Sequence, residues 1–148
     1  MKANGKLAVD TNAVIAYREG IKPVCKLIDE SDILFLPVIV LGELLYGAKN
    51  SARQLENEGA INIFSNNSVI VPIDESIAIR YAKVRLKLKK AGCPIPENDI
   101  WVAATCLDID VPLLSKDGHF ENIPDLEVIC WEKNHSKMTR GEGPIRKK

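Results

Sequence analysis

Residues 6–17, KLAVDTNAVIAY, contain the pattern that decides the fold. The short apolar run LAV ends at Asp10, Thr11 and Asn12, three residue types that are favoured at the start of a helix. An apolar helical segment follows through Tyr17. The stretch therefore predicts a short buried strand that leads directly into a helix, with an aspartate at the junction.

Strands and helices keep alternating along the rest of the chain. The most regular helix is predicted over 75–91, where apolar residues recur at steps of three and four, and the proline-rich stretch 92–96 stops it. Further strands are predicted at 33–36, 69–71, 111–114 and 126–129, and further helices over 23–30, 38–48, 52–64 and from 98 to about 107. This alternation predicts an α/β fold in which helices cover both faces of a parallel sheet.

The charge of the chain is balanced overall but unevenly distributed. At 148 residues the chain has the length of one domain, and its net charge of zero argues against a generally cationic nucleic-acid binder. From Lys133 onward, six Lys and Arg residues stand against the single acid Glu142. We therefore expect a mildly acidic domain over 1–132, which can attract metal ions, and a basic, disordered tail over 133–148, which can attract phosphates.

The four cysteines do not form a zinc-binding pattern. Cys25, Cys93, Cys106 and Cys130 contain no CxxC pair and have no neighbouring His. The N-terminus carries only a three-residue apolar run, which is too short for a signal peptide, and no segment reaches the length of a membrane span. We expect reduced thiols, no membrane association and a cytoplasmic location.

Glu43 is the only charged residue in a long apolar stretch, residues 33–48. Its helix, VIVLGELLYGA, is apolar nearly all round, so we expect it to be buried. An ionised glutamate in such a helix is costly unless it is paired or binds a cation. Two interpretations stay open at this point. Glu43 is a cation ligand, or it pairs with a lysine or arginine elsewhere or lies on the one hydrated strip of the helix.

Three aspartates are predicted to lie at one edge of the sheet. Asp10 closes the first strand, Asp99 opens a helix after a proline-rich turn, and Asp117 follows the fourth strand. The carboxyl ends of parallel strands and the helix starts beyond them face the same edge, where ligands bind. Carboxylates cluster there only with a cation or by taking up protons. The alternative is that Asp10 and Asp99 are ordinary helix N-caps and Asp117 belongs to an ordinary turn.

Four segments in the expected order resemble the PIN domain family, and within it the VapC toxins of bacterial and archaeal toxin–antitoxin pairs. They are LAVDTNAVI (7–15), GELLYGA (42–48), RLKLKKAGCPIPENDIWVAA (85–104) and LLSKDGHFENIPDLEVICW (113–131), so the resemblance spans nearly the whole chain before the tail. The segment Leu36-Pro37-Val38 departs from the family pattern, because many relatives carry Ser or Thr there, and the tail is longer and more basic than in a minimal toxin. The resemblance implies a PIN-like three-layer α/β/α sandwich with a central parallel sheet of four to five strands.

The resemblance also implies a metal site. In such domains the metal site is formed by acids that match Asp10, Glu43, Asp99 and Asp117. Polar neighbours that orient these acids match Thr11, Asn12, Asn98 and Ser115. Carboxylate oxygens are ligands that suit Mg²⁺ or Mn²⁺.

The implied activity is that of a magnesium-dependent endoribonuclease, the toxin of a VapBC-type pair. Water attacking phosphorus in line would leave a 5′-phosphate and a 3′-hydroxyl, with Asp99 as a candidate proton acceptor. The implied partners are an RNA substrate, a cognate antitoxin whose C-terminal segment blocks the pocket, and a second copy of the chain in a homodimer.

Basic residues recur at helical steps on the helix over 75–91, at Arg80, Lys83, Lys87 and Lys90. Phosphate contacts supply most of the non-specific affinity for nucleic acid, but a solvated helix face is an equally good interpretation of the stripe. We single out only Arg85, beside the stripe, as a substrate-binding residue. His119 could contact RNA, but a histidine in a turn is more often simply exposed, and we expect that here. Tyr46 and Trp101 are expected to pack rather than to stack on bases.

Two other functions compete with the ribonuclease. An aspartate after the first strand could be the nucleophile of a haloacid-dehalogenase-like phosphatase, but that class needs a second acid two residues on, where this chain has Asn12. A catalytically inert RNA- or protein-binding module is the stronger rival. Degenerate modules usually lose at least one acid, whereas this chain keeps all four.

Overall fold

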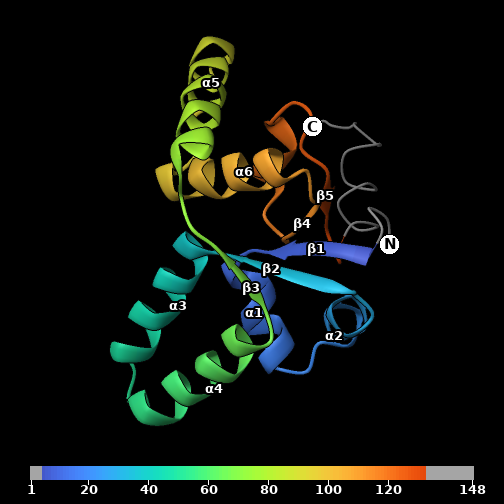
Figure 1. Cartoon of the computed structure of the whole chain (residues 1–148), viewed down its shortest axis with the longest axis vertical. Helices are drawn as coiled ribbons and strands as arrows, with labels where there is room; N and C mark the ends of the chain where they lie inside the picture. Colours follow the sequence, from blue (N-terminus) through green and yellow to red (C-terminus); the bar gives the residue numbers. More distant parts are fainter. Residues whose placement is uncertain (1–4, 133–148) are drawn as a thin grey trace, which may run out of the picture.

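One parallel sheet of five strands forms the centre of the fold (Figure 1). The computed structural model describes residues 5–132. Neighbouring strands run parallel, with Leu7 opposite Leu34 and Ala8 opposite Leu113 on the two sides of the central strand. The strands are β1 (Lys6–Val9), β2 (Ile33–Pro37), β3 (Val69–Val71), β4 (Leu113–Leu114) and β5 (Val128–Ile129).

The order of the strands, β3-β2-β1-β4-β5, reverses direction beside β1. The chain runs from β1 through β2 to β3 towards one edge of the sheet, then returns to the other side of β1 to form β4 and β5. Such a reversal opens a crevice at the carboxyl ends of the two strands that flank it. Residues just after β1 and just after β4 therefore share one crevice.

Helices cover both faces of the sheet in the described part of the chain. Figure 1 shows α1 to α4 on one side and α6 on the other, with α5 packed against α6 and projecting beyond it. The helices are α1 (Thr11–Arg18), α2 (Lys22–Asp29), α3 (Val38–Lys49), α4 (Gln54–Asn66), α5 (Glu75–Ala91) and α6 (Glu97–Ile109), together with the short 3₁₀ helix η2 (Gly118–Asn122). The arrangement confirms the predicted three-layer α/β/α sandwich.

The core is mainly aliphatic, in keeping with an aromatic content of only 5%. Among residues 5–132, Phe64 and Phe120 are the only buried aromatic side chains. Trp101 is half-buried on α6 and stacks on Tyr81 of α5, with ring centroids 3.7 Å apart and planes 10° from parallel. The expectation that Trp101 packs is confirmed, and the stacked pair joins α5 to the rest of the domain.

The start of α6 and the lengths of β4 and β5 differ from the sequence prediction. Helix α6 begins at Glu97, with Pro96 at the capping position, so Asn98 and Asp99 lie in its first turn rather than before it. The strands predicted at 111–114 and 126–129 keep only two residues each in the sheet. Within residues 5–132, no helix combines the length and the apolar character needed to cross a membrane. The predicted tail, 133–148, lies outside the described residues.

Candidate metal centre

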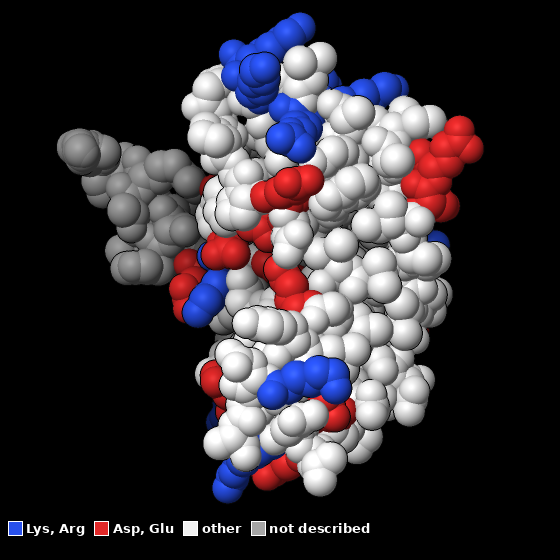
Figure 2. Space-filling model, turned by 90° about the vertical axis from the view of Figure 1, so that its left-hand side faces the viewer, with Lys and Arg blue, Asp and Glu red and all other residues white. Residues whose placement is uncertain are grey.

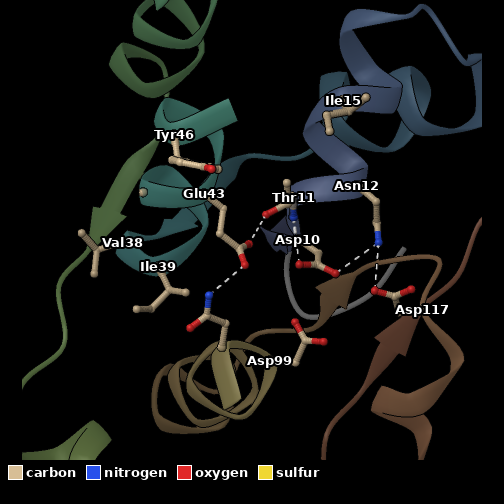
Figure 3. A pocket seen from close by; sticks show the side chains of 12 residues that line it. Asp10, Thr11, Asn12, Ile15, Val38, Ile39, Glu43, Tyr46, Asp99 and Asp117 are labelled. Atoms are coloured by element: carbon tan, nitrogen blue, oxygen red, sulfur yellow. Dashed lines mark hydrogen bonds between the residues drawn. The ribbon is translucent and has the colours of Figure 1, made fainter. Parts of the chain in front are cut away.

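The carboxyl edge of the sheet, where β1 and β4 end, brings the predicted acids together (Figure 3). Asp10 directly follows β1 and caps α1, because its Oδ1 accepts a hydrogen bond from the backbone N–H of Thr11 at 2.8 Å. Asp117 follows β4, Glu43 lies on α3, and Asp99 lies in the first turn of α6. Asp10 is thus the predicted helix cap, and it also belongs to a cluster of four acids that line one pocket.

Asp10 is fixed by hydrogen bonds from two side chains. Its Oδ2 accepts from the Ser115 hydroxyl at 2.7 Å and from the Asn12 amide at 3.3 Å. The same Asn12 nitrogen lies 3.3 Å from Oδ2 of Asp117. Asp10 is 3% exposed and Ser115 is fully buried. Asn12 therefore stands between two carboxylates of the cluster, and Ser115 holds one of them in place.

Burial raises the pKa of Asp10 from 3.8 to about 6. The hydrogen bonds from Ser115 and from the backbone of Thr11 oppose this rise in the pKa, whereas the negative charges of Asp99 and Asp117 add to it. The buried carboxylate thus lacks positive charge, and a cation beside it would favour its ionised form. A perturbed carboxylate in a crevice is a candidate functional group.

Helix α3 is not buried all round, which corrects the sequence prediction. Val40, Leu44 and Ala48 are its buried residues, while Tyr46 is 70% exposed. Part of the apolar surface of α3 lines the pocket rather than the core. The expectation that Tyr46 packs is therefore wrong, because its position on the helix directs it to the pocket and not to the sheet.

Glu43 lies on the pocket side of α3 and is half-buried. Its Oε1 accepts a hydrogen bond from the Thr11 hydroxyl at 2.5 Å, and its Oε2 accepts one from the Asn98 amide at 3.1 Å. Both partners are neutral, so within residues 5–132 the predicted alternative of a pairing with lysine or arginine is not found. The negative charge of Glu43 remains available to a cation in the pocket.

Asp99 contacts His119, which the sequence places in an exposed turn. Nε2 of His119 lies 2.6 Å from Oδ2 of Asp99, and the exposed fractions of the two side chains are 33% and 15%. Burial raises the pKa of Asp99, the contact with His119 opposes that rise, and the charges of Asp117 and Glu43 add to it. The expectation that His119 is simply exposed is wrong. Its only signal in the sequence was that it follows Asp117 by two positions.

The pocket has a volume of about 910 Å³ and two chemically different walls (Figure 3). The polar wall contains the four acids with Thr11, Asn12 and Asn98. The other wall is mainly apolar and is formed by Val38, Ile39, Gly42 and Tyr46 of α3, while Ile15 adds apolar surface on α1, on the opposite side of the pocket (Figure 3). A charged or metal-binding group would lie against the first wall and a flat apolar group against the second.

Arg85 does not line this pocket. It lies on α5, where its guanidinium donates a hydrogen bond to the Tyr81 hydroxyl at 2.6 Å and lies 3.7 Å from the carboxylate of Glu97. Glu97 is two residues before Asp99 at the start of α6. Arg85 is therefore tied to the helix that carries one of the acids, but on the outside of the acid cluster.

The donor set of the acid cluster fits a divalent cation that prefers oxygen. Such an ion binds carboxylates, and the hydroxyl and amide groups beside them fix the orientation of the ligands. The four acids that could hold the ion are Asp10, Glu43, Asp99 and Asp117, and the polar residues that could orient them are Thr11, Asn12, Asn98 and Ser115. Burial and the neighbouring charges of Asp99 and Asp117 raise the pKa of Asp10, and a cation bound in the pocket would oppose that rise.

Comparison with known proteins identifies relatives along most of the chain. The model of the family described as "PIN domain" matches residues 7–126. The protein named Ribonuclease VapC of Rickettsia bellii is 32% identical over 127 residues, which cover 83% of this chain and 94% of the relative. Ribonuclease VapC1 of Haemophilus influenzae is 28% identical over 130 residues, which cover 84% and 97%.

Solved structures with the same fold point in the same direction. The structure of VapBC-1 from nontypeable Haemophilus influenzae matches with a TM-score of 0.78 and 27% identity, over 85% of this chain and 98% of that chain. VapBC2 from Rickettsia felis, solved with a DNA fragment from its promoter, matches with a TM-score of 0.78 over the same shares, and at 22% identity it supports the fold alone. The family model covers well over half of the chain, and the chain therefore belongs to the PIN domain family.

Proposed function

We propose that the protein is a metal-dependent endoribonuclease, which uses Asp10, Glu43, Asp99 and Asp117 to hold Mg²⁺ or Mn²⁺ and acts as the toxin of a VapBC-type pair. The observation that carries the proposal is the convergence of these four acids in one pocket at the carboxyl edge of the sheet. Relatives that align with almost their full length are named ribonucleases, which supports RNA as the substrate class.

The proposed reaction is hydrolysis of an RNA phosphodiester by water. A divalent cation, when bound, supplies charge neutralisation at the phosphate and a lower pKa for a water molecule. Asp99 is the proposed proton acceptor, because burial raises its pKa and makes it a stronger base than an ordinary aspartate. In-line attack by water leaves a 5′-phosphate on one product and a 3′-hydroxyl on the other.

The apolar wall of the pocket supports an unpaired nucleotide as the substrate. Tyr46 exposes 70% of its surface there, beside Val38 and Ile39. Gly42 lies one helical turn before Tyr46. A Cβ atom at that position would have no heavy atom within 4 Å apart from its chain neighbours and the backbone of its own helix, so the pocket is open beside this part of α3. An aromatic ring in open space offers a stacking surface for a base, whereas a paired base is already stacked within its duplex.

Arg85 and the basic residues of α5 are the proposed phosphate contacts outside the pocket. Figure 2 shows Lys and Arg side chains gathered at the top of the molecule, where α5 lies, above a group of acidic side chains near the middle of the face. A strand of RNA that enters the acidic pocket would place its neighbouring phosphates near such positive charge. Among these residues Arg85 is the one tied to α6 through Glu97.

The proposed partners are a cognate antitoxin and a second copy of the chain. Structures that share this fold include VapBC complexes, and the match with 27% identity supports a VapB-like partner for this chain as well. A basic side chain of the antitoxin would find four carboxylates in the pocket, and apolar residues beside it would find the apolar wall of α3 at Ile39 or the side chain of Ile15 on α1. Homodimerisation is proposed from the family resemblance alone.

The rival functions fit the pocket less well. A phosphatase would need an acid at position 12, where the Asn12 amide instead donates to Asp10. An inert binding module would have no use for a buried carboxylate whose pKa is raised to about 6, since burying such a group costs stability. The inert module nevertheless remains the alternative against which the experiment is designed.

Cleavage of total cellular RNA by the purified, antitoxin-free protein tests the proposal. With Mg²⁺ the wild type should release discrete fragments with 5′-phosphate ends, and EDTA should abolish them. Asp10→Asn should slow cleavage roughly a hundredfold or more, while Glu19→Gln, which removes an exposed carboxylate of α1's C-terminal end, should cleave normally. Fragments with 2′,3′-cyclic phosphates would contradict hydrolysis, and folded protein that cleaves nothing would favour the inert module.

A further inference from the structure

We propose that His119 is a nitrogen ligand of the cation, so that the Asp99 end of the pocket is a mixed nitrogen and oxygen site that prefers Mn²⁺ to Mg²⁺. The inference rests on the metal site of the proposed function, and not on the cleavage of RNA. It adds to the four acids a residue that the sequence alone assigned to an exposed turn.

The ligand atoms are already gathered. One side-chain atom each of Asp99, Asp117 and His119 lies within 4.8 Å of the other two. Nε2 of His119 is 2.6 Å from Oδ2 of Asp99 and 4.0 Å from Oδ2 of Asp117. Two atoms that bind one ion at about 2.1 Å each, at right angles, lie about 3 Å apart. Shifts of roughly 1 Å or less in the two contacts of His119 would therefore bring its Nε2 and these carboxylate oxygens to the spacing of ligands of one ion.

The fold holds the imidazole beside Asp99 and leaves Asp117 adjustable. His119 belongs to η2 and precedes Phe120, which is fully buried and whose ring centroid lies 5.1 Å from that of the imidazole. The buried phenylalanine anchors the backbone on which His119 sits. The Asp117 side chain is 44% exposed and follows β4 in a loop, so it is the ligand with freedom to approach.

The identity of the donor decides which ion is preferred. Mg²⁺ binds oxygen ligands almost exclusively and keeps several waters, whereas imidazole nitrogen binds first-row transition metals more readily. A site with only Asp10, Glu43, Asp99 and Asp117 would be an all-oxygen site. Adding His119 therefore shifts the preference towards Mn²⁺ without removing the capacity to bind Mg²⁺.

A short contact between His119 and Asp99 is also what an internal ion pair would give. In that case a protonated imidazole would supply the positive charge of the pocket, and the His119 side chain would move away from Asp99 when the cation binds. The two roles differ in one observable, which is whether nitrogen is bound to the metal in the loaded protein.

Pulsed electron paramagnetic resonance of Mn²⁺ bound to the purified full chain tests for that nitrogen. The wild type should show electron spin echo modulation from a directly bound ¹⁴N, and His119→Gln should lose it. The chain has only one other histidine, so His135→Gln is the matched control and should keep the modulation. In calorimetric titrations, His119→Gln should weaken Mn²⁺ binding roughly tenfold or more and Mg²⁺ binding much less.

Mn²⁺ bound to the wild type without nitrogen modulation would overturn the inference, even if His119→Gln failed to fold. Modulation that persists in His119→Gln, or a wild type that binds no Mn²⁺, would overturn it as well. RNA cleavage is measured separately. Nitrogen modulation in a protein that cleaves no RNA would refute the proposed nuclease activity and leave His119 as a metal ligand. Cleavage of RNA without nitrogen modulation would support the nuclease activity and refute His119 as a ligand.

Discussion

Thr11 donates its hydroxyl hydrogen to Oε1 of Glu43 across 2.5 Å, and this contact joins the first turn of α1 to the middle of α3. The other carboxylate oxygen accepts from Asn98 on α6. Three helices that are far apart in sequence are therefore linked at one carboxylate, and the hydrogen bonds fix its direction into the pocket.

Replacing Thr11 by valine keeps the shape of the side chain but removes the donor. We expect the free energy of unfolding to fall by about 0.5–1.5 kcal/mol, because one hydrogen bond is lost. The rate of RNA cleavage should fall by a larger factor than the loss of one hydrogen bond explains, because the Glu43 carboxylate is no longer held in its direction towards the pocket. Urea unfolding and a cleavage assay measure the two effects. Thr11→Ser keeps the hydroxyl, and equal behaviour of the serine and valine variants would contradict the positioning role.

Asp10→Asn should stabilise the protein in EDTA at pH 7. The rise in the pKa of Asp10 from 3.8 to about 6 corresponds to about 3 kcal/mol, and the loss of the acceptor for the Ser115 and Asn12 hydrogen bonds offsets about 2 kcal/mol of it. The folded state binds the Asp10 proton more tightly than the unfolded state, so wild-type stability is lost as the pH rises through about 6. The advantage of the variant should therefore shrink towards pH 4. Urea unfolding at both pH values measures it, and an advantage that does not change with pH would contradict the assignment.

Mn²⁺ or Mg²⁺ should raise the thermal midpoint of the wild type, because an ion that binds only the folded state stabilises it. At about one hundred times the dissociation constant the gain is about 2.7 kcal/mol. Asp99→Asn removes a charge from the site and should lose most of this shift. Scanning calorimetry at fixed ionic strength measures it, with Glu19→Gln as a matched variant outside the pocket. A shift of the same size in all three proteins would point to a cation bound elsewhere.

Tyr46→Leu should weaken binding of single-stranded RNA by about 1–3 kcal/mol, because a stacking surface is lost. Tyr46 is 70% exposed, so folding stability should hardly change. Tyr46→Phe keeps the ring and should bind as the wild type does. Fluorescence anisotropy with a labelled oligonucleotide, in Ca²⁺ or on the inactive Asp10→Asn background, measures the affinity. Equal losses with leucine and phenylalanine would assign the effect to the hydroxyl instead.

Arg85→Gln should reduce the dependence of RNA affinity on salt. Each phosphate contact to a single strand contributes about 0.7 to the slope of log affinity against log salt, so the slope should fall by about that amount. Lys22→Gln, on the exposed start of α2, removes the same charge away from α5 and is the matched control. Equal slopes for both variants would mean that Arg85 contributes only general charge.

The sequence was sufficient for the parts of the fold that local chemistry dictates. An apolar strand that ends at Asp10 and a helix capped there are set by neighbouring residues, and parallel strands bring Asp10 and Asp117 to one edge. Composition could not tell which side of α3 faces the sheet, because apolar side chains serve equally in a core and in a pocket wall. Tyr46 was misjudged for that reason.

The contact between His119 and Asp99 could not be predicted from neighbouring residues, for a different reason. The two residues are twenty positions apart and belong to η2 and α6, and their distance depends on how the loop after β4 folds back over α6. No hydrophobic periodicity or helix-capping residue in the sequence indicates the path of the loop after β4. The residues brought together by strand order were therefore predictable, and the pair brought together by a loop was not.

The Asn12 amide, held between Asp10 and Asp117, has a consequence for the order of events in the cell. Each acid of the pocket already has a polar partner from the protein itself: Asp10 accepts from Ser115 and Asn12, Asp117 from Asn12, and Glu43 from Thr11 and Asn98, while Asp99 contacts His119. We therefore expect the newly made chain to complete its fold before it binds the proposed ion. Folding and activation would then be separate steps, because the ion would enter a pocket whose acids already have partners instead of assembling it.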